Sequence, residues 1–96
     1  MRIAAPAAQQ LERGRCWWIE NRHKAPLAFT DELAELVACL EARPELVGRP
    51  VEQDASVRRV YLRRIRYYVY FEIAGDHSLV TVLAVWHASR GGEPAL

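Results

Sequence analysis

The stretch VRRVYLRRIRYYVYFEI, residues 57–73, decides the fold of this chain because its side chains alternate along the backbone. Val, Tyr, Phe and Ile in alternation over residues 57–64 and 66–74 are typical of half-buried strands. Residues 79–87 are apolar at nearly every position, which predicts a strand covered on both faces in the centre of the sheet. The segment AGDHS at residues 74–78 predicts a hairpin turn between the last two strands.

Before residue 57, the apolar side chains recur at helical spacing instead. One helix is predicted from Pro6 to about residues 21–23, with an apolar face formed by Ala7, Leu11, Gly14 and Trp18. A second is predicted from Pro26 to Pro44, with an apolar face formed by Phe29, Leu33, Leu36, Val37 and Leu40 and with Asp31, Glu32 and Glu35 facing away. Joined by a short loop, the two helices predict an antiparallel hairpin in which Gly14 lets another backbone approach closely.

The 96 residues allow a single domain, residues 1–96, and leave no room for a second one. Residues 45–56 lack an apolar period and predict a connecting loop, and the polar residues 89–96 predict a tail that is flexible from about residue 91. The chain reaches Gln9 and Gln10 before an apolar segment could form, and no apolar run approaches the roughly 20 residues of a membrane span. We therefore expect a cytoplasmic protein without a membrane partner.

The net charge of +1 hides an asymmetry between the two halves of the chain. Residues 1–56 carry seven basic and nine acidic side chains, whereas residues 57–96 carry six basic and three acidic ones. Twelve of the thirteen basic residues are Arg, and the only Lys is Lys24. The second half is therefore predicted to form a basic face whose planar guanidinium groups suit phosphate or carboxylate.

The two cysteines do not predict a metal site. Cys16 and Cys39 lie 23 positions apart, without a CxxC motif or a Cys/His cluster at ligand spacing. Both fall within the predicted helices, so we expect reduced thiols that behave as small apolar side chains, in preference to a disulfide.

The densest chemical signal is a cluster of arginines and tyrosines. Residues 57–66 contain Arg58, Arg59, Arg63, Arg64 and Arg66, and the neighbouring tyrosines are Tyr61, Tyr67, Tyr68 and Tyr70. Guanidinium groups that pair with phosphates, next to rings that stack on bases, would suit nucleic acid. An acidic protein surface fits the same pattern. An ordinary solvated strand face is the remaining alternative.

Two further signals lie outside this cluster. At the end of the last predicted strand, His87 is suited to proton transfer and Arg90 to a developing phosphate charge, although one His and one Arg at a strand end are more often structural. Ser89 beside His87 does not make a catalytic triad, which is defined by geometry. Trp17 falls off the apolar face that holds Trp18, and an exposed aromatic side chain can mark a partner surface.

Several short pieces occur in a characteristic order along the chain. They are WWIENR (residues 17–22) followed by AP (25–26), then Phe29 with Glu32 and Leu33, Pro44, GRP (48–50), VRRV (57–60), RYYVY (66–70) and LAVWHASRG (83–91). This ordered set resembles the RelE/ParE superfamily of type II toxin–antitoxin toxins over essentially the whole chain. The resemblance implies an α+β fold of order β-α-α-β-β-β, with a helical hairpin on one side of a small twisted antiparallel sheet. The other side of the sheet would be a concave, basic working face.

The resemblance also implies partners and site residues. A cognate ParD-like antitoxin would wrap the toxin with its C-terminal segment, and Trp17 and Trp18 are the predicted antitoxin-binding residues. The predicted target-binding residues are Arg58, Arg59, Arg63, Arg64 and Tyr68. No metal and no cofactor is implied.

Two modes of action divide this superfamily. RelE-like members cut messenger RNA on the ribosome without a metal, and in that case Arg66, His87 and Arg90 would be catalytic, with Glu52 as a further carboxylate. ParE-like members poison DNA gyrase. The lysines of the RelE nuclease strand are absent here, and LAVWHASRG resembles ParE-like chains called plasmid stabilisation proteins. We therefore predict a ParE-like gyrase inhibitor, with the ribosome-dependent endonuclease as the alternative and a non-toxic RNA-binding module as a third.

Overall fold

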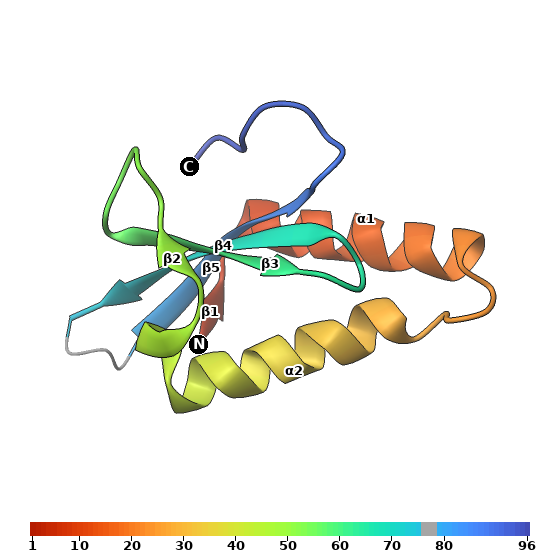
Figure 1. Cartoon of the computed structure of the whole chain (residues 1–96), viewed down its shortest axis with the longest axis horizontal. Helices are drawn as coiled ribbons and strands as arrows, with labels where there is room; N and C mark the ends of the chain where they lie inside the picture. Colours follow the sequence, from red (N-terminus) through yellow and green to blue (C-terminus); the bar gives the residue numbers. More distant parts are fainter. Residues whose placement is uncertain (76–78) are drawn as a thin grey trace.

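The computed structural model describes residues 1–75 and 79–96, which form a helical hairpin and a five-stranded sheet (Figure 1). In chain order the elements are β1 (Arg2–Ile3), α1 (Ala5–Asn21), α2 (Ala28–Ala42), the 3-10 helix η1 (Pro44–Leu46), β2 (Arg49–Pro50), β3 (Val57–Leu62), β4 (Tyr67–Ala74) and β5 (Leu79–His87). The predicted α+β class and the order β-α-α-β-β-β are confirmed, and β2 is an additional short strand.

The helices bury the faces that their spacing predicts. The buried side chains and glycine are Ala7, Gly14 and Trp18 of α1 and Ala28, Phe29, Leu36 and Leu40 of α2. The start of the second helix is a correction, because α2 begins at Ala28 and not at Pro26. The Ala28 N–H donates to the Ala25 carbonyl at 3.2 Å, so Pro26 occupies a turn, where its fixed φ suits the first central position.

Gly14 permits the closest contact between the helices. A Cβ at this position would lie 2.6 Å from Cζ of Phe29 and 3.2 Å from the Tyr67 hydroxyl oxygen. The group that Gly14 admits is therefore an aromatic ring, not a backbone as the sequence suggested. The Phe29 ring also meets Tyr67 edge-on, with 5.3 Å between the ring centroids.

The sheet has the strand order β1-β5-β4-β3-β2. β4 occupies the centre that the sequence assigned to β5. Strand β5 has β4 along one side, but β1 pairs with it only at Thr81 and Val82, because β1 contains two residues. β2 pairs with β3 inside the predicted loop, where Pro50 sits on an edge strand, as a residue without an N–H must.

The sheet separates two apolar layers. The helix side is packed with Leu62, Val69, Phe71, Val80, Val82 and Val85 of the strands, together with Ile65 of the β3–β4 turn. The opposite side, here called the open face, carries a smaller cluster of Val57, Tyr70 and Ala84 with Tyr68, Leu83 and Trp86 against it. A register shift between β4 and β5 pairs Tyr70 with Ala84 but Phe71 with Val82. This bulge leaves Leu83 without a partner and packs it against the open-face cluster.

The β3–β4 turn is held from inside. Ile65 is fully buried, and the Glu32 carboxylate of α2 accepts hydrogen bonds from the backbone N–H groups of Arg64 and Ile65 at 3.3 and 3.2 Å. Glu32 therefore faces this turn, contrary to the expectation that it points away from the sheet. Arg66 closes the turn with φ of 61°, a left-handed conformation unusual for a residue other than glycine.

The segment after β5 returns across the open face (Figure 1). Gln53 donates from Nε2 to the Glu93 carboxylate at 2.7 Å, and Pro94 is buried near Tyr70 and Leu83. The predicted tail thus contacts the rest of the domain. Of the predicted hairpin turn between β4 and β5, residues 76–78 lie outside the described residues, while the pairing of Ala74 with Leu79 confirms the hairpin itself.

Both cysteines are free, as expected, and both are exposed. They lie on the outer surfaces of the two helices, away from the apolar faces. Within residues 1–75 and 79–96, neither helix combines the length and the apolar character that crossing a membrane requires.

We predict that Gly14→Ala destabilises the domain. Alanine gains about 1 kcal/mol of helix propensity, but its Cβ would overlap a rigid, buried ring, and overpacking costs about 1–3 kcal/mol. Urea unfolding should show a net loss of stability. Gly91→Ala is the matched control, since its Cβ would meet nothing within 4 Å, and it should leave the midpoint unchanged. Equal midpoints for Gly14→Ala and the wild type would contradict the packing described.

Candidate functional site

The open face carries an arginine held by tyrosine rings. The Arg59 guanidinium carbon lies 4.6 Å from the centroid of Tyr68 and 6.0 Å from that of Tyr70. A hydrogen bond to the Tyr70 hydroxyl raises the pKa of Arg59 above its ordinary value, and the nearby carboxylate of Glu93 acts in the same direction. Tyr61 packs on Tyr68 with 4.9 Å between centroids. Of the arginines and tyrosines that the sequence grouped together, Arg59, Tyr61, Tyr68 and Tyr70 therefore come together on this face.

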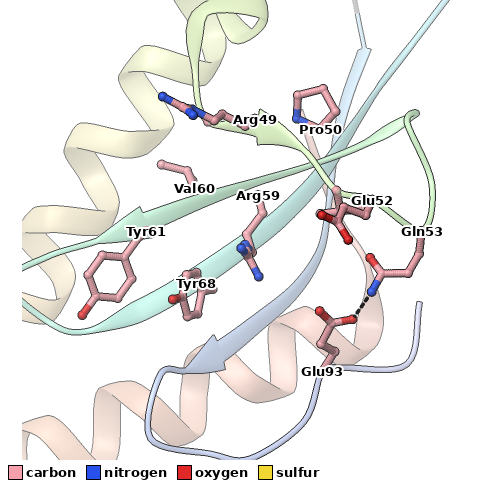
Figure 2. A pocket seen from close by; sticks show the side chains of 11 residues that line it. Arg49, Pro50, Glu52, Gln53, Arg59, Val60, Tyr61, Tyr68 and Glu93 are labelled. Carbon is pink, nitrogen blue, oxygen red and sulfur yellow. Dashed lines mark hydrogen bonds between the residues drawn. The ribbon is translucent and has the colours of Figure 1, made fainter.

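This cluster lines a hollow of about 620 Å³ (Figure 2). Arg49 joins it as the cross-strand partner of Arg59. Figure 2 also shows Glu52 from the loop after β2, and Glu93 from the returning chain end, on the same side as Arg59. The hollow thus contains both signs of charge, which corrects the expectation of a purely basic face. Tertiary folding brings Glu93 here from 34 positions along the chain.

Arg58 lies on the other face of β3 and makes structural contacts. Its guanidinium donates to the carbonyl oxygens of Val47 at 2.9 Å, Gly48 at 2.8 Å and Glu45 at 3.4 Å. These bonds tie η1 and β2 to β3. Arg58 and Arg59 are adjacent in sequence, but strand alternation gives them opposite faces, so they do not act on one surface.

The remaining predicted arginines surround the β3–β4 turn. Arg63, Arg64 and Arg66 are exposed, whereas Ile65 between them is buried. The Ala88 N–H donates to the Arg66 carbonyl at 2.9 Å, which places this turn beside the end of β5. The predicted residues Arg66, His87 and Arg90 therefore lie at one end of the sheet, some distance along β3 from Arg59.

His87 lies on the helix side of the sheet. It pairs with Tyr67 across the strands, and the two rings meet edge-on at 4.9 Å. Burial raises the pKa of the Tyr67 hydroxyl. The backbone N–H of Ser89 donates to Nδ1 of His87 at 3.1 Å, and the Ser89 hydroxyl lies 2.6 Å from the same nitrogen. Because a backbone N–H can only donate, the neutral His87 ring carries its proton on Nε2.

This geometry limits what His87 can do. In that tautomer Nε2 can donate a hydrogen bond but cannot accept a proton, and the accepting nitrogen is covered by Ser89. Among the described residues no carboxylate orients the ring, so the close Ser89 hydroxyl does not complete a triad. The arrangement suits binding of an acceptor group better than general base catalysis.

Arg90 is fixed by an aromatic ring. Its guanidinium carbon lies 3.9 Å above the centroid of Trp86, at the edge of the open face. Trp86 Nε1 is buried without a hydrogen-bond partner among the described residues. The stacking holds Arg90 at the end of the sheet.

The two tryptophans predicted to bind the antitoxin differ in environment. Trp18 is 8% exposed, and its Nε1 donates to the Ala25 carbonyl at 2.7 Å, so it anchors the loop between the helices. Trp17 is 43% exposed, with the Arg22 guanidinium 5.3 Å from its ring. Neither lines the apolar groove described next.

An apolar groove, which the resemblance led us to expect near the helices, runs between the helices and β1. It has a volume of about 320 Å³, and its apolar lining includes Met1, Ile3, Leu11, Leu33 and Val37. Part of its lining was predictable from the sequence, since Leu11, Leu33 and Val37 belong to the predicted apolar faces of the helices. The helical pattern could not show that the sheet leaves them half-buried.

The described residues contain no group of three or more His, Cys, Asp or Glu side chains that could hold a metal ion. The structure presents guanidinium groups, aromatic rings and apolar side chains for contact with a partner. Two surfaces present these groups, the open face around Arg59 and the helix side around His87.

Comparisons with known proteins agree with this architecture. No curated protein matches the sequence. Among solved structures, the chain is similar to a chain described as "Chromosomal ParDE TA system from P. aeruginosa", with a TM-score of 0.72 and 20% sequence identity, over 92% of this chain and 94% of that one. At this identity the likeness shows the fold. The family model described as the ParE toxin of the type II toxin–antitoxin system parDE matches residues 1–91. The chain thus belongs to the ParE family, the toxin component of type II toxin–antitoxin systems.

Proposed function

We propose that this ParE-family toxin arrests growth in the cytoplasm by poisoning DNA gyrase. The observation that carries the choice of target is the separation of the basic side chains. Arg59 and Arg49 line the hollow of the open face, whereas His87 lines a pocket on the helix side. A nuclease needs its proton-transfer group and the surface that holds the RNA around one reacting atom. His87 shares its pocket with Arg13 and Arg90, but the arginine–tyrosine surface around Arg59 lies on the other face of the sheet. This separation supports an inhibitor that binds its target rather than a catalyst.

The tautomer of His87 supports the same choice. With Nδ1 accepting from the Ser89 backbone, the ring has no free nitrogen to take a proton from a 2′-hydroxyl. The only lysine, Lys24, lies in the loop between the helices, far along the chain from the sheet arginines. These features weigh against the ribosome-dependent endonuclease.

One observation keeps the endonuclease as a second candidate. Arg59, Tyr61 and Tyr68 present a cation beside stacked rings on the open face, as a surface for unstacked RNA bases would. The non-toxic RNA-binding module has no comparable support, because the chain belongs to a toxin family.

Induction of the protein in cells should separate the two targets. We expect gyrase-linked double-strand breaks and a DNA-damage response, without new 5′ ends in translated messages. Break mapping and primer extension on the same cultures measure both. Cuts in ribosome-bound messages that disappear in His87→Ala would contradict the gyrase proposal and favour the endonuclease.

We also propose that Arg59 contacts the target, and that Arg58 does not. Arg59→Gln should reduce growth inhibition and cost only about 0.5–1 kcal/mol of stability, since it removes exposed cation–π contacts with Tyr68 and Tyr70. Arg58→Gln should instead lower stability by about 1.5–3 kcal/mol, because it removes charged hydrogen bonds to backbone carbonyls. Colony counts after induction and thermal melts of the purified variants give the two readouts. A fully toxic Arg59→Gln variant would show that the target does not bind through Arg59 on the open face.

The antitoxin, we propose, binds the apolar groove between the helices and β1. The chain belongs to the toxin family of the parDE toxin–antitoxin system, so its partner is a cognate antitoxin. Met1 and Ile3 flank the groove and are exposed, although such side chains are usually buried. An amphipathic segment that folds as it binds would cover them and the half-buried Leu33 and Val37.

Val37→Glu should therefore weaken antitoxin binding, with the largest loss in the dissociation rate. The expected effect is about tenfold or more, because a carboxylate would be desolvated on the apolar lining. Leu27→Glu is the control, since Leu27 is 63% exposed and lies outside the groove. Biolayer interferometry with the antitoxin encoded beside the toxin measures both variants. Equal losses of affinity for both variants, or no loss for Val37→Glu, would show that the antitoxin binds a different surface.

A further inference from the structure

A small pocket between α1 and the end of β5 gathers basic side chains. It has a volume of about 230 Å³, and Arg13, Trp17, Tyr67, His87 and Arg90 are among its lining residues. No lining residue is acidic. Within residues 1–75 and 79–96, neither Arg13 nor Arg90 forms an ion pair, whereas Arg15 and Arg43 do. The pocket therefore differs in charge from the mixed hollow on the open face.

Three donors of the pocket come from three parts of the chain. Arg13 belongs to the middle of α1, His87 ends β5, and Arg90 follows it. Stacking at 3.9 Å on Trp86 restrains the Arg90 guanidinium. The Ser89 backbone and the Tyr67 ring restrain His87, which leaves Nε2–H as its free donor. His87 is thus oriented before any ligand arrives, which lowers the entropic cost of binding, while Trp86 holds Arg90 at the edge of the sheet beside the pocket.

We propose that this pocket binds a phosphate group. Arg13, His87 and Arg90 together bring several N–H donors to the pocket, which suits a tetrahedral group with several acceptor oxygens better than a carboxylate with two oxygens in one plane. A phosphate also carries three strong acceptors and more charge than a carboxylate. The proposal does not depend on whether gyrase or messenger RNA is the target.

Trp17 extends the site from a phosphate to a nucleotide. It lines the same pocket and is 43% exposed, so its ring is accessible to a ligand. A base attached to the bound phosphate stacks on this ring, as bases do on exposed aromatic side chains. The phosphate belongs either to a free nucleotide, whose terminal group offers those three acceptor oxygens, or to a nucleic-acid backbone, whose phosphodiester offers two free oxygens and a single charge.

Isothermal titration of the purified protein with inorganic phosphate, 5′-AMP and a ten-residue oligothymidylate tests the proposal. Arg13→Gln and Arg90→Gln should each weaken binding of all three probes about tenfold or more, since each removes a charged hydrogen bond. Trp17→Ala should weaken binding of AMP and the oligonucleotide but not of inorganic phosphate. An oligonucleotide that binds at least tenfold more tightly than AMP identifies the backbone as the source, and equal or weaker binding identifies the free nucleotide.

Arg2→Gln is the matched control, because it removes the same charge from β1, outside the pocket. Thermal melts verify that each variant is folded. The proposal fails if none of the probes binds, if Arg2→Gln weakens binding as much as Arg13→Gln, or if a glutamate-rich decapeptide binds as tightly as the oligonucleotide. These outcomes leave the choice of gyrase untouched, because that choice is tested by DNA breaks in cells.

Discussion

The Phe29 ring of α2 contacts Gly14 of α1 and Tyr67 of β4, and so it joins the two helices to the sheet. Phe29 is 2% exposed, and its ring occupies the space that a Cβ at Gly14 would fill. The same ring meets Tyr67 of β4 edge-on, and Tyr67 in turn meets His87 of β5. One chain of aromatic contacts therefore runs from the helical hairpin to the end of the sheet. Because interiors are closely packed, the position of His87 depends on how closely the two helices approach.

The sheet between these layers divides the functional chemistry into two surfaces. Strand alternation sends Arg59 to the open face and Arg58 to the helix side, where it binds backbone carbonyls. The same alternation sends Trp86 to the open face and His87 to the helix side. A toxin of 96 residues thereby offers distinct sites: the hollow around Arg59, the pocket around His87 and the apolar groove beside β1. Distinct surfaces allow an antitoxin and a target to be recognised by different residues.

Local features of the backbone determine which side chains surround the arginines on the open face and at the β3–β4 turn. The bulge in β5 packs Leu83 against the open-face cluster, and there the returning chain end finds an apolar surface for Pro94. That return brings Glu93 to Gln53 and close to Arg59 (Figure 2). On the other side, Glu32 binds the backbone of the β3–β4 turn and so holds three exposed arginines around one buried isoleucine. An acidic side chain thus acts on each group of arginines. Glu32 binds the backbone of the turn that carries Arg64, and the charge of Glu93 acts on Arg59.

The sequence by itself determined the helical hairpin, the three long strands, the exposure of Trp17 and the pairing of an arginine with tyrosines on one strand face. Each follows from local periodicity, which reports which face of an element is buried. Periodicity carries no information on which distant part of the chain an element packs against. Only the tertiary structure therefore decided that Glu32 faces the β3–β4 turn and that Glu93 reaches Arg59. The bulge at Leu83 and the two-residue strand β2 were equally inaccessible, because pairing over so few residues leaves no repeating pattern, and β1 was expected only from the resemblance to the superfamily. His87 and Arg13 meet in one pocket for the same reason: 74 residues separate them along the chain, and the packing of α1 on β5 brings them together.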